Sequence, residues 1–307
     1  MMKRLVCLFA AVAACACGSA PEKTASDEPK TFKMIEVPAL LGTPEERAEY
    51  VARNYWKNFD FSDTAYIRLP EVTEQAFAGY VAVLGQLPPD LAAVSVRTTL
   101  SGAEADTAMF AYFTELFDKY LYDPNSPVRN EEIYIPVLEY IVASDKVSEA
   151  DKVRPRYRLG MALKNRPGEP AADFTYTLAS GTTGTLYGVK ADYLILFINN
   201  PGCTACKETV ERIVSSELLS EQIARGRVKV LAVYPDEDLA AWRDYRSQIP
   251  AEWINGYDAQ RKMTHDELYD LKAIPTLYLL SSDKKVILKD VPAGVVERYL
   301  AGVLGGR

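Results

Sequence analysis

Residues 197–210 read FINNPGCTACKETV, and the two cysteines in this stretch, Cys203 and Cys206, stand three positions apart. The stretch follows a solid apolar run, residues 193–198, which is typical of a strand buried on both faces, and it precedes a helix-forming sequence. A loop leading from a strand into a helix would place both sulfur atoms at the helix N-terminus, where unpaired backbone N–H groups carry partial positive charge. Such surroundings lower a cysteine pKa from about 8.5 to between about 3.5 and 7.5, so we expect a thiolate at Cys203.

This cysteine pair suits disulfide exchange. A thiolate at Cys203 can attack a substrate disulfide, and Cys206, one turn later, can displace the substrate and leave an intramolecular bridge. A zinc site would need four ligands, usually a second cysteine pair or two histidines. The body of the chain adds only His265, which we expect to face solvent at a helix start, so we predict no metal. A purely structural bridge over so short a loop would remove little chain entropy.

Around the cysteine pair, strands and helices alternate, which predicts an α/β fold with helices on both faces of a central sheet. A capping box at residues 264–267 is expected to open a short helix. The predicted strands are 173–178, 193–198, 228–234, 277–280 and 286–288, and the predicted helices cover 204–225, 237–246 and the segment from about 293.

Residues 43–164 are predicted to form an all-α helical domain. Capping boxes begin at Thr43 and Ser101, and Thr73 and Asp90 are further candidates for helix starts. Apolar residues between positions 109 and 121 repeat at three and four residues, which indicates one buried helix face. A stretch from 126 to 141 is expected to be kinked by its internal proline at position 136.

The helical region is rich in Tyr and Phe and contains Trp56. These rings could form a recognition surface, but a bundle core with tyrosine hydroxyls at its edge is the simpler interpretation. The region has no Cys, no His and no glycine-rich phosphate loop, so it shows no catalytic constellation.

The first 20 residues, MMKRLVCLFAAVAACACGSA, have a basic start, an apolar core and a small-residue end, as a secretory leader does. Residues 12–15 resemble the bacterial lipobox, which predicts a lipoprotein signal peptide over 1–17 with lipidation at Cys15, or at Cys17 as a second candidate. Residues 18–34 are interpreted as a flexible tether. We therefore expect a lipid-anchored protein of the cell envelope that faces the periplasm, on either the inner or the outer membrane.

The bulk composition limits the partners. The formal charge is −7 among 307 residues, which argues against nucleic acid. Three of the five cysteines lie in the leader region, so only the pair at 203 and 206 remains in the folded body. An exported protein with a single closely spaced pair is not a disulfide-stapled scaffold.

Residues 171–210, beginning AADFTYTL, together with LKAIPTLYLL at 271–280, resemble the thioredoxin fold in its exported, membrane-tethered form, the TlpA/ResA-like thiol-disulfide oxidoreductases. The resemblance implies a thioredoxin-like domain over 167–307, preceded by the helical domain over 35–166. It also implies that Pro275 is cis, faces the cysteines and contributes to catalysis, and that Ile274, Thr276 and Gly202 dock an extended substrate. The helical region resembles an uncharacterised domain that precedes thioredoxin modules in some envelope lipoproteins.

Several positions depart from that family. Gly202 replaces the usual aromatic residue and should widen the approach to Cys203, and Phe197 replaces the buried acid of thioredoxins. Thr209 stands where some tethered reductases carry an acid, so the base for Cys206 is open, with water or the neighbouring Glu208 as candidates.

The resulting prediction is an envelope enzyme that exchanges disulfides with exported proteins, draws electrons from a membrane or periplasmic donor, and needs no cofactor beyond its own cysteine pair. The residues between the cysteines leave the direction open, and the family favours a reductase. A peroxiredoxin is disfavoured because Asn200 stands where a Thr or Ser would bind peroxide. The alternative from another class is an envelope scaffold lipoprotein whose helical domain recruits a partner and whose thioredoxin-like domain is idle.

Overall fold

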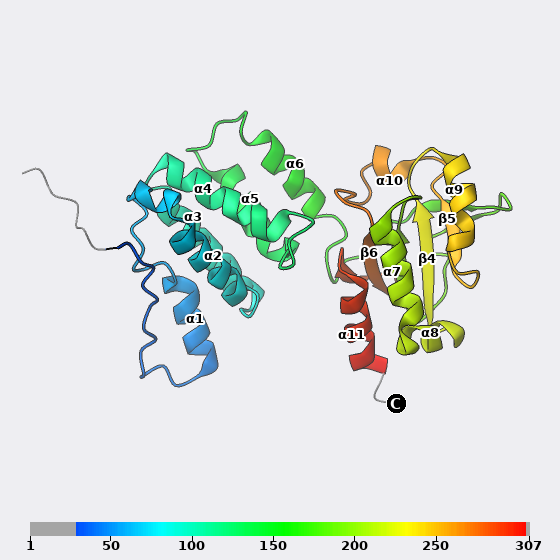
Figure 1. The fold of residues 1–307 in the computed structure, drawn as a ribbon, viewed down its shortest axis with the longest axis horizontal. Helices are drawn as coiled ribbons and strands as arrows, with labels where there is room; N and C mark the ends of the chain where they lie inside the picture. The colour runs from blue at the N-terminus through cyan, green and yellow to red at the C-terminus, as the bar shows by residue number, and fades with distance from the viewer. Residues whose placement is uncertain (1–28, 305–307) are drawn as a thin grey trace, which may run out of the picture. The chain divides into compact units, whose positions relative to one another are not determined.

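The computed structural model describes residues 29–304 and divides them into a helical region and an α/β region (Figure 1). The leader and both lipidation candidates lie outside the described residues. Among the described helices, none is long and apolar enough to cross a membrane. The helical region contains α1 (Pro44–Asn54), a 3-10 turn (Thr64–Arg68), α2 (Pro70–Leu84), α3 (Pro89–Ala103), α4 (Thr107–Phe117), a π-helical turn (Asp118–Tyr122), α5 (Glu131–Ala143) and α6 (Val153–Ala162).

Most aromatic residues of the helical region lie in its core or pack against it, and Tyr157 is an exposed exception. Trp56 is 6% exposed, and its ring lies within 6.4 Å of seven other aromatic rings, measured between centroids. Phe32, which the sequence assigns to the tether, packs on Tyr55 at 5.5 Å and on Trp56 at 5.2 Å. The packed structure therefore includes residue 32.

Helix starts in this region differ from several sequence predictions. The Thr43 capping box is present as predicted. The Ser101 box is wrong, because Ser101 lies inside α3 and the next helix is capped by Asp106, whose carboxylate accepts from two backbone N–H groups. Thr73 lies inside α2, where its buried hydroxyl donates to the Tyr66 carbonyl oxygen at 2.9 Å. Polar residues that match a capping pattern in the sequence can therefore lie inside a helix, where their side chains take part in tertiary contacts.

Two further helix starts were also misplaced. Asp90 is the second residue of α3 rather than its cap, and α5 starts at Glu131 after the cap Asn130, not at position 126. Pro136 lies inside α5 as expected.

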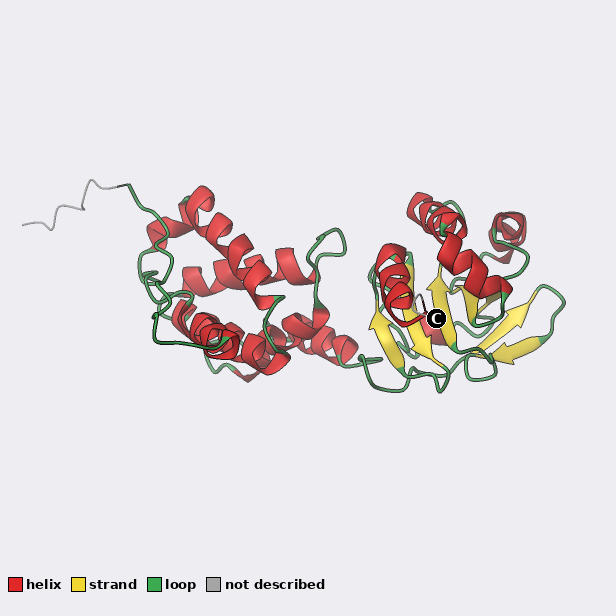
Figure 2. Cartoon of the chain, turned by 90° about the horizontal axis from the view of Figure 1, so that it is seen from below, coloured by secondary structure: helices red, strands yellow, loops and turns green. Residues whose placement is uncertain are grey.

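The α/β region contains one seven-stranded mixed sheet with strand order β2-β1-β5-β4-β3-β6-β7 (Figure 2). The central strand β3 pairs in parallel with β4 and antiparallel with β6. The strands are β1 (Thr175–Leu178), β2 (Thr183–Thr185), β3 (Tyr193–Ile198), β4 (Val228–Tyr234), β5 (Ile254–Tyr257), β6 (Thr276–Ser281) and β7 (Val286–Lys289). The helices are α7 (Thr204–Ser215), α8 (Glu217–Ala224), α9 (Leu239–Tyr245), α10 (Lys262–His265) and α11 (Ala293–Leu304).

Side chains of β3 alternate between two apolar cores, one on each face of the sheet. Ile195 and Phe197 pack in the core that also contains Cys206 and residues of α7, α8 and α11. Leu194, Leu196 and Ile198 pack on the opposite face with residues of the 171–189 segment and the 263–280 region. Because both faces of β3 are covered, its end is a fixed platform for the loop that follows.

The α/β region departs from the sequence predictions at four places. The strands β2 and β5 were not predicted, and the single predicted helix over 204–225 is two helices separated at Ser216. The capping box at 264–267 does not open a helix, because α10 ends at His265 and Glu267 adopts a positive φ of 49°.

Candidate active site

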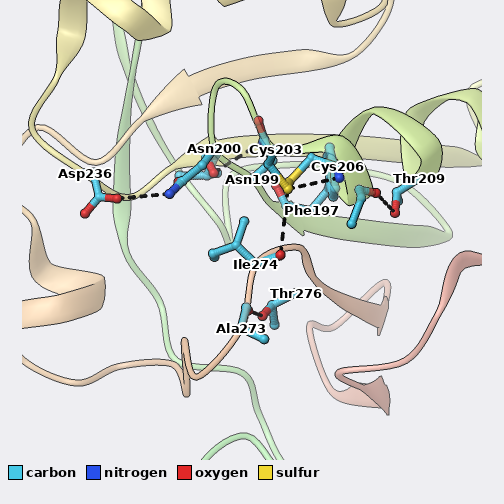
Figure 3. The surroundings of a disulfide bond; sticks show 12 residues. Phe197, Asn199, Asn200, Cys203, Cys206, Thr209, Asp236, Ala273, Ile274 and Thr276 are labelled. Atoms are coloured by element: carbon cyan, nitrogen blue, oxygen red, sulfur yellow. Dashed lines mark hydrogen bonds between the residues drawn. A yellow bond between two sulfur atoms is a disulfide. The ribbon is translucent and has the colours of Figure 1, made fainter. Parts of the chain in front are cut away.

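The two cysteines lie at the junction of the β3–α7 loop and α7, and a disulfide joins them with a Cα–Cα distance of 5.2 Å (Figure 3). Cys203 is the N-cap residue of α7, and its Sγ atom accepts a hydrogen bond from the backbone N–H of Cys206 at 3.1 Å. A helix N-terminus presents its unpaired N–H groups to such an atom and favours negative charge there. The helix therefore supplies the polarised setting that a thiolate at Cys203 requires.

The two sulfur atoms have unequal surroundings. Cys206 is 0% exposed and belongs to the apolar core beneath α7, whereas Cys203 is partly exposed. An incoming disulfide can therefore reach Cys203 but not Cys206. The two sulfur atoms therefore differ in access: Cys203 can meet a substrate, and Cys206 can meet only Cys203.

The loop before β6 faces Cys203. The Ile274–Pro275 peptide bond is cis, and the Ile274 carbonyl oxygen lies 3.7 Å from the Cys203 Sγ atom (Figure 3). Ile274 and Pro275 are partly exposed, whereas Thr276 is 1% exposed and its hydroxyl donates to the Ala273 carbonyl oxygen at 2.7 Å. The Thr276 side chain therefore braces this loop from inside and is not on its accessible surface.

The loop before Cys203 is open on its outer side. Gly202 is exposed with a φ of +73°, and an added Cβ atom there would meet nothing within 4 Å. Below it, the Asn200 side chain donates to the Asp236 carboxylate at 3.1 Å, and buried Asn199 donates to the Phe197 and Val233 carbonyl oxygens. Sequence reasoning missed the roles of Asn199 and Asp236 in holding this loop, because both contacts depend on the adjacent strand β4.

The groups near Cys206 include no carboxylate at the two family positions. Phe197 is fully buried and packs edge-on against Trp253 at 6.2 Å, and the Thr209 hydroxyl donates to the Ala205 carbonyl oxygen at 2.8 Å. Glu208 is exposed on α7. The structure therefore places Glu208 on the solvent side of the helix, away from the apolar core that holds Cys206.

The remaining titratable candidates lie apart from the sulfurs. His265 is exposed at the end of α10, as expected, and burial raises the pKa of Tyr278 well above its usual value of 10. Tyr278 packs on the sheet face opposite the one that holds Cys206. Within residues 29–304, no group of three His, Cys, Asp or Glu side chains is arranged to hold a metal ion.

Comparison with known proteins adds the family. Residues 16–165 match a domain of unknown function, DUF5106. A crystal structure of a thioredoxin-like protein from Bacteroides caccae is 50% identical in sequence and covers 89% of this chain and 99% of its own, with a TM-score of 0.85. No protein with a curated description matches the chain.

Shorter matches cover less than half of the chain. The C-terminal domain of an uncharacterised Bacteroides fragilis protein is 50% identical over 45% of this chain and 98% of its own, with a TM-score of 0.44. A domain of a possible thiol-disulfide isomerase from Cytophaga hutchinsonii is 25% identical. The match covers 46% of this chain and 95% of that domain, with a TM-score of 0.40. The match that spans both regions decides the assignment: the chain belongs to the thioredoxin-like proteins that carry a helical DUF5106 domain ahead of the thioredoxin-like domain.

Proposed function

We propose that the protein is a thiol-disulfide oxidoreductase in which Cys203 is the attacking residue and Cys206 the resolving one. The observation that supports this assignment is the contrast between the two sulfurs. Cys203 is accessible at a helix N-terminus, and Cys206 is buried and bonded to it. The loop at Pro275 lies opposite Cys203, where an extended substrate could lie against it.

The proposed reaction transfers two electrons and uses only the two cysteine side chains. The Cys203 thiolate attacks one sulfur of a substrate disulfide, forms a mixed disulfide, and releases the other substrate sulfur as a thiolate that takes up a proton. The Cys206 thiol loses its proton and attacks the Cys203 sulfur. This step forms the Cys203–Cys206 bond and releases the second substrate thiol. A dithiol donor then reduces the bridge for the next cycle.

The N-terminus of α7 and a water molecule are proposed to assist these steps. The helix N-terminus and the Cys206 N–H stabilise the Cys203 thiolate. Because Glu208 is exposed and Phe197 occupies the family's acid position, water is the better candidate than Glu208 for the base that deprotonates Cys206.

The proposed direction is reduction of disulfides in exported proteins, with electrons from a membrane or periplasmic donor. The proposed location is the cell envelope, with a lipid at Cys15, or Cys17, holding the protein on one membrane. These proposals rest on the leader sequence and on the resemblance to tethered reductases. Gly202 leaves open space beside Cys203, because an added Cβ atom there would meet nothing within 4 Å, and this space suits clients with bulky flanking residues.

The test is reduction of insulin by dithiothreitol, followed by turbidity, with the soluble body and its Cys203→Ser variant. We expect the wild type to accelerate the reaction and the variant to give the uncatalysed rate. Equal rates would reject the enzyme and favour the scaffold alternative. A redox titration then gives the direction: a potential near about −270 mV indicates a reductant, and one near about −120 mV indicates an oxidant.

A further inference from the structure

The segment that leads to Pro275 is held by a partly buried lysine, Lys272. Lys272 lies two positions before Ile274, and its side chain is 14% exposed. Its ammonium nitrogen lies 3.1 Å from Glu131 Oε1 and 3.1 Å from Asp270 Oδ2. The same nitrogen lies 5.0 Å from the centre of the Tyr122 ring, within the range of a cation–π contact.

Glu131 belongs to the helical domain, in the first turn of α5, 141 positions from Lys272. Its carboxylate is 16% exposed, and its second oxygen contacts the Lys289 ammonium, which is 5% exposed. Beside this contact the Arg129 guanidinium donates to Asp290 at 3.0 Å. Three cations therefore face three carboxylates: Arg129, Lys272 and Lys289 against Glu131, Asp270 and Asp290.

Two further bonds fix the same segment from residues that follow α6. The Lys164 ammonium donates to the Glu267 carbonyl oxygen at 2.6 Å, and the Asn165 side chain donates to the Leu268 carbonyl oxygen at 2.8 Å. Residues 267–272 are thus attached at three points to residues outside the sheet. A buried ion pair stabilises little by itself, but removal of one partner leaves an uncompensated charge, so such a pair fixes a geometry.

The segment held by these contacts leads directly to the residue that lies beside the Cys203 sulfur atom. Only Ala273 separates Lys272 from Ile274, whose carbonyl oxygen lies 3.7 Å from the Cys203 Sγ atom. Thr276 closes the turn by bonding Ala273. A displacement of Lys272 would therefore move the Ile274–Pro275 peptide relative to Cys203.

We propose that Glu131 is a positioning residue for disulfide exchange, and that the helical domain acts in catalysis by holding the Pro275 loop in place for a polypeptide substrate. This inference rests on the proposed function. It predicts that the contact matters for substrates that lie along the loop and not for a small disulfide that needs only access to Cys203.

The test compares Glu131→Gln with Glu132→Gln in the soluble body containing both domains. Glu132 is the next residue of α5, and its carboxylate pairs with Arg166 instead of Lys272. The substitution therefore removes the same charge from the same helix turn without touching the loop. Each variant is assayed with insulin, and in its reduced form with the small disulfide 5,5′-dithiobis(2-nitrobenzoate).

We expect Glu131→Gln to lower kcat/KM for insulin at least 5-fold, mainly through KM, and to leave the rate with the small disulfide within 2-fold of wild type. Glu132→Gln should stay within 2-fold in both assays. Unchanged insulin kinetics in Glu131→Gln, or an equal loss in both assays, would overturn the inference.

If Glu131→Gln does not fold, as judged by circular dichroism, Lys272→Gln replaces it with the same expected outcome. Failure of both variants to fold would mean that the network serves stability alone, which also overturns the inference. A wild-type protein without Cys203-dependent insulin reduction would instead reject the proposed function. The two failures are therefore distinguishable.

Discussion

The helical and α/β regions bury polar groups in different ways. In the helical core, the Tyr80 hydroxyl lies 2.9 Å from the Ser95 hydroxyl and accepts from Thr99 at 2.8 Å, so three buried hydroxyls satisfy one another. At the start of α7, buried Cys206 is bonded to Cys203, which is partly exposed. The three hydroxyls bond only to groups inside the core and therefore stabilise the fold. The buried sulfur of Cys206 is instead bonded to the accessible sulfur of Cys203, which a substrate can reach. Under the proposed function, the helical core supports the fold and the cysteine pair carries out the reaction.

The largest expected effect is the loss of stability when a buried ring is removed from either core. Only removal from the core that contains Cys206 should also change the redox potential of the cysteine pair. Trp56→Ala and Phe197→Ala should each cost roughly 3–5 kcal/mol of unfolding free energy, because each removes a buried ring. Only Phe197 shares a core with Cys206. Its loss should admit water beside that thiol and shift the redox potential by roughly 10–30 mV towards less negative values. Denaturant unfolding and a glutathione redox titration measure both quantities.

The matched Trp56→Ala variant should keep the wild-type potential while losing as much stability. An equal shift of the potential in both variants would show that the cores are not chemically distinct.

A smaller effect is expected from two glycines in opposite settings. Gly202 has a φ of +73° beside Cys203, so Gly202→Ala should destabilise the protein by about 1–2 kcal/mol. Gly160 lies inside α6 with open space around it, so Gly160→Ala should stabilise by about 0.5–1 kcal/mol. Thermal unfolding of the two variants gives the signs. Stabilisation by Gly202→Ala would contradict the conformation of the loop.

The smallest effect concerns a surface ion pair of the helical region. Hydrogen bonds from Lys119 and from the Tyr120 hydroxyl hold the pKa of Glu74 below its usual value of 4.5. The carboxylate therefore adds stability above its unfolded pKa, and this contribution is lost as the pH falls through the lower folded value. Glu74→Gln should cost less than about 1 kcal/mol at pH 7 and nothing near pH 2. Urea unfolding of the wild type and the variant at both pH values measures this difference in the free energy of unfolding. An equal loss of stability at both pH values would show that the contribution of Glu74 does not come from its charge.

Sequence patterns predicted the elements that are decided locally. The strands at 193–198 and 228–234 have the predicted bounds, because short runs that are almost wholly apolar and rich in β-branched residues are typical of strands covered on both faces. The position of the cysteine pair at the start of a helix that follows a buried strand was also predictable from the local sequence. These features need no information from distant residues.

Other features depend on tertiary contacts. The strand β5 reads INGY, a sequence with little strand preference, and it forms because it pairs with β4 and β1. The capping patterns at Ser101 and Thr264 were misleading because a helix already passes through or ends at these positions. The contact between Glu131 and Lys272 joins residues 141 positions apart, so no local pattern indicates it.

The most direct test of the central claim is to trap the mixed disulfide. Reduced Cys206→Ser and Cys203→Ser proteins are each incubated with oxidised insulin and analysed by non-reducing electrophoresis and mass spectrometry. We predict a covalent adduct through Cys203 in the Cys206→Ser variant and none in the Cys203→Ser variant, because Cys206 is buried. An adduct through Cys206, or no adduct in either variant, would contradict the assignment of Cys203 as the attacking residue.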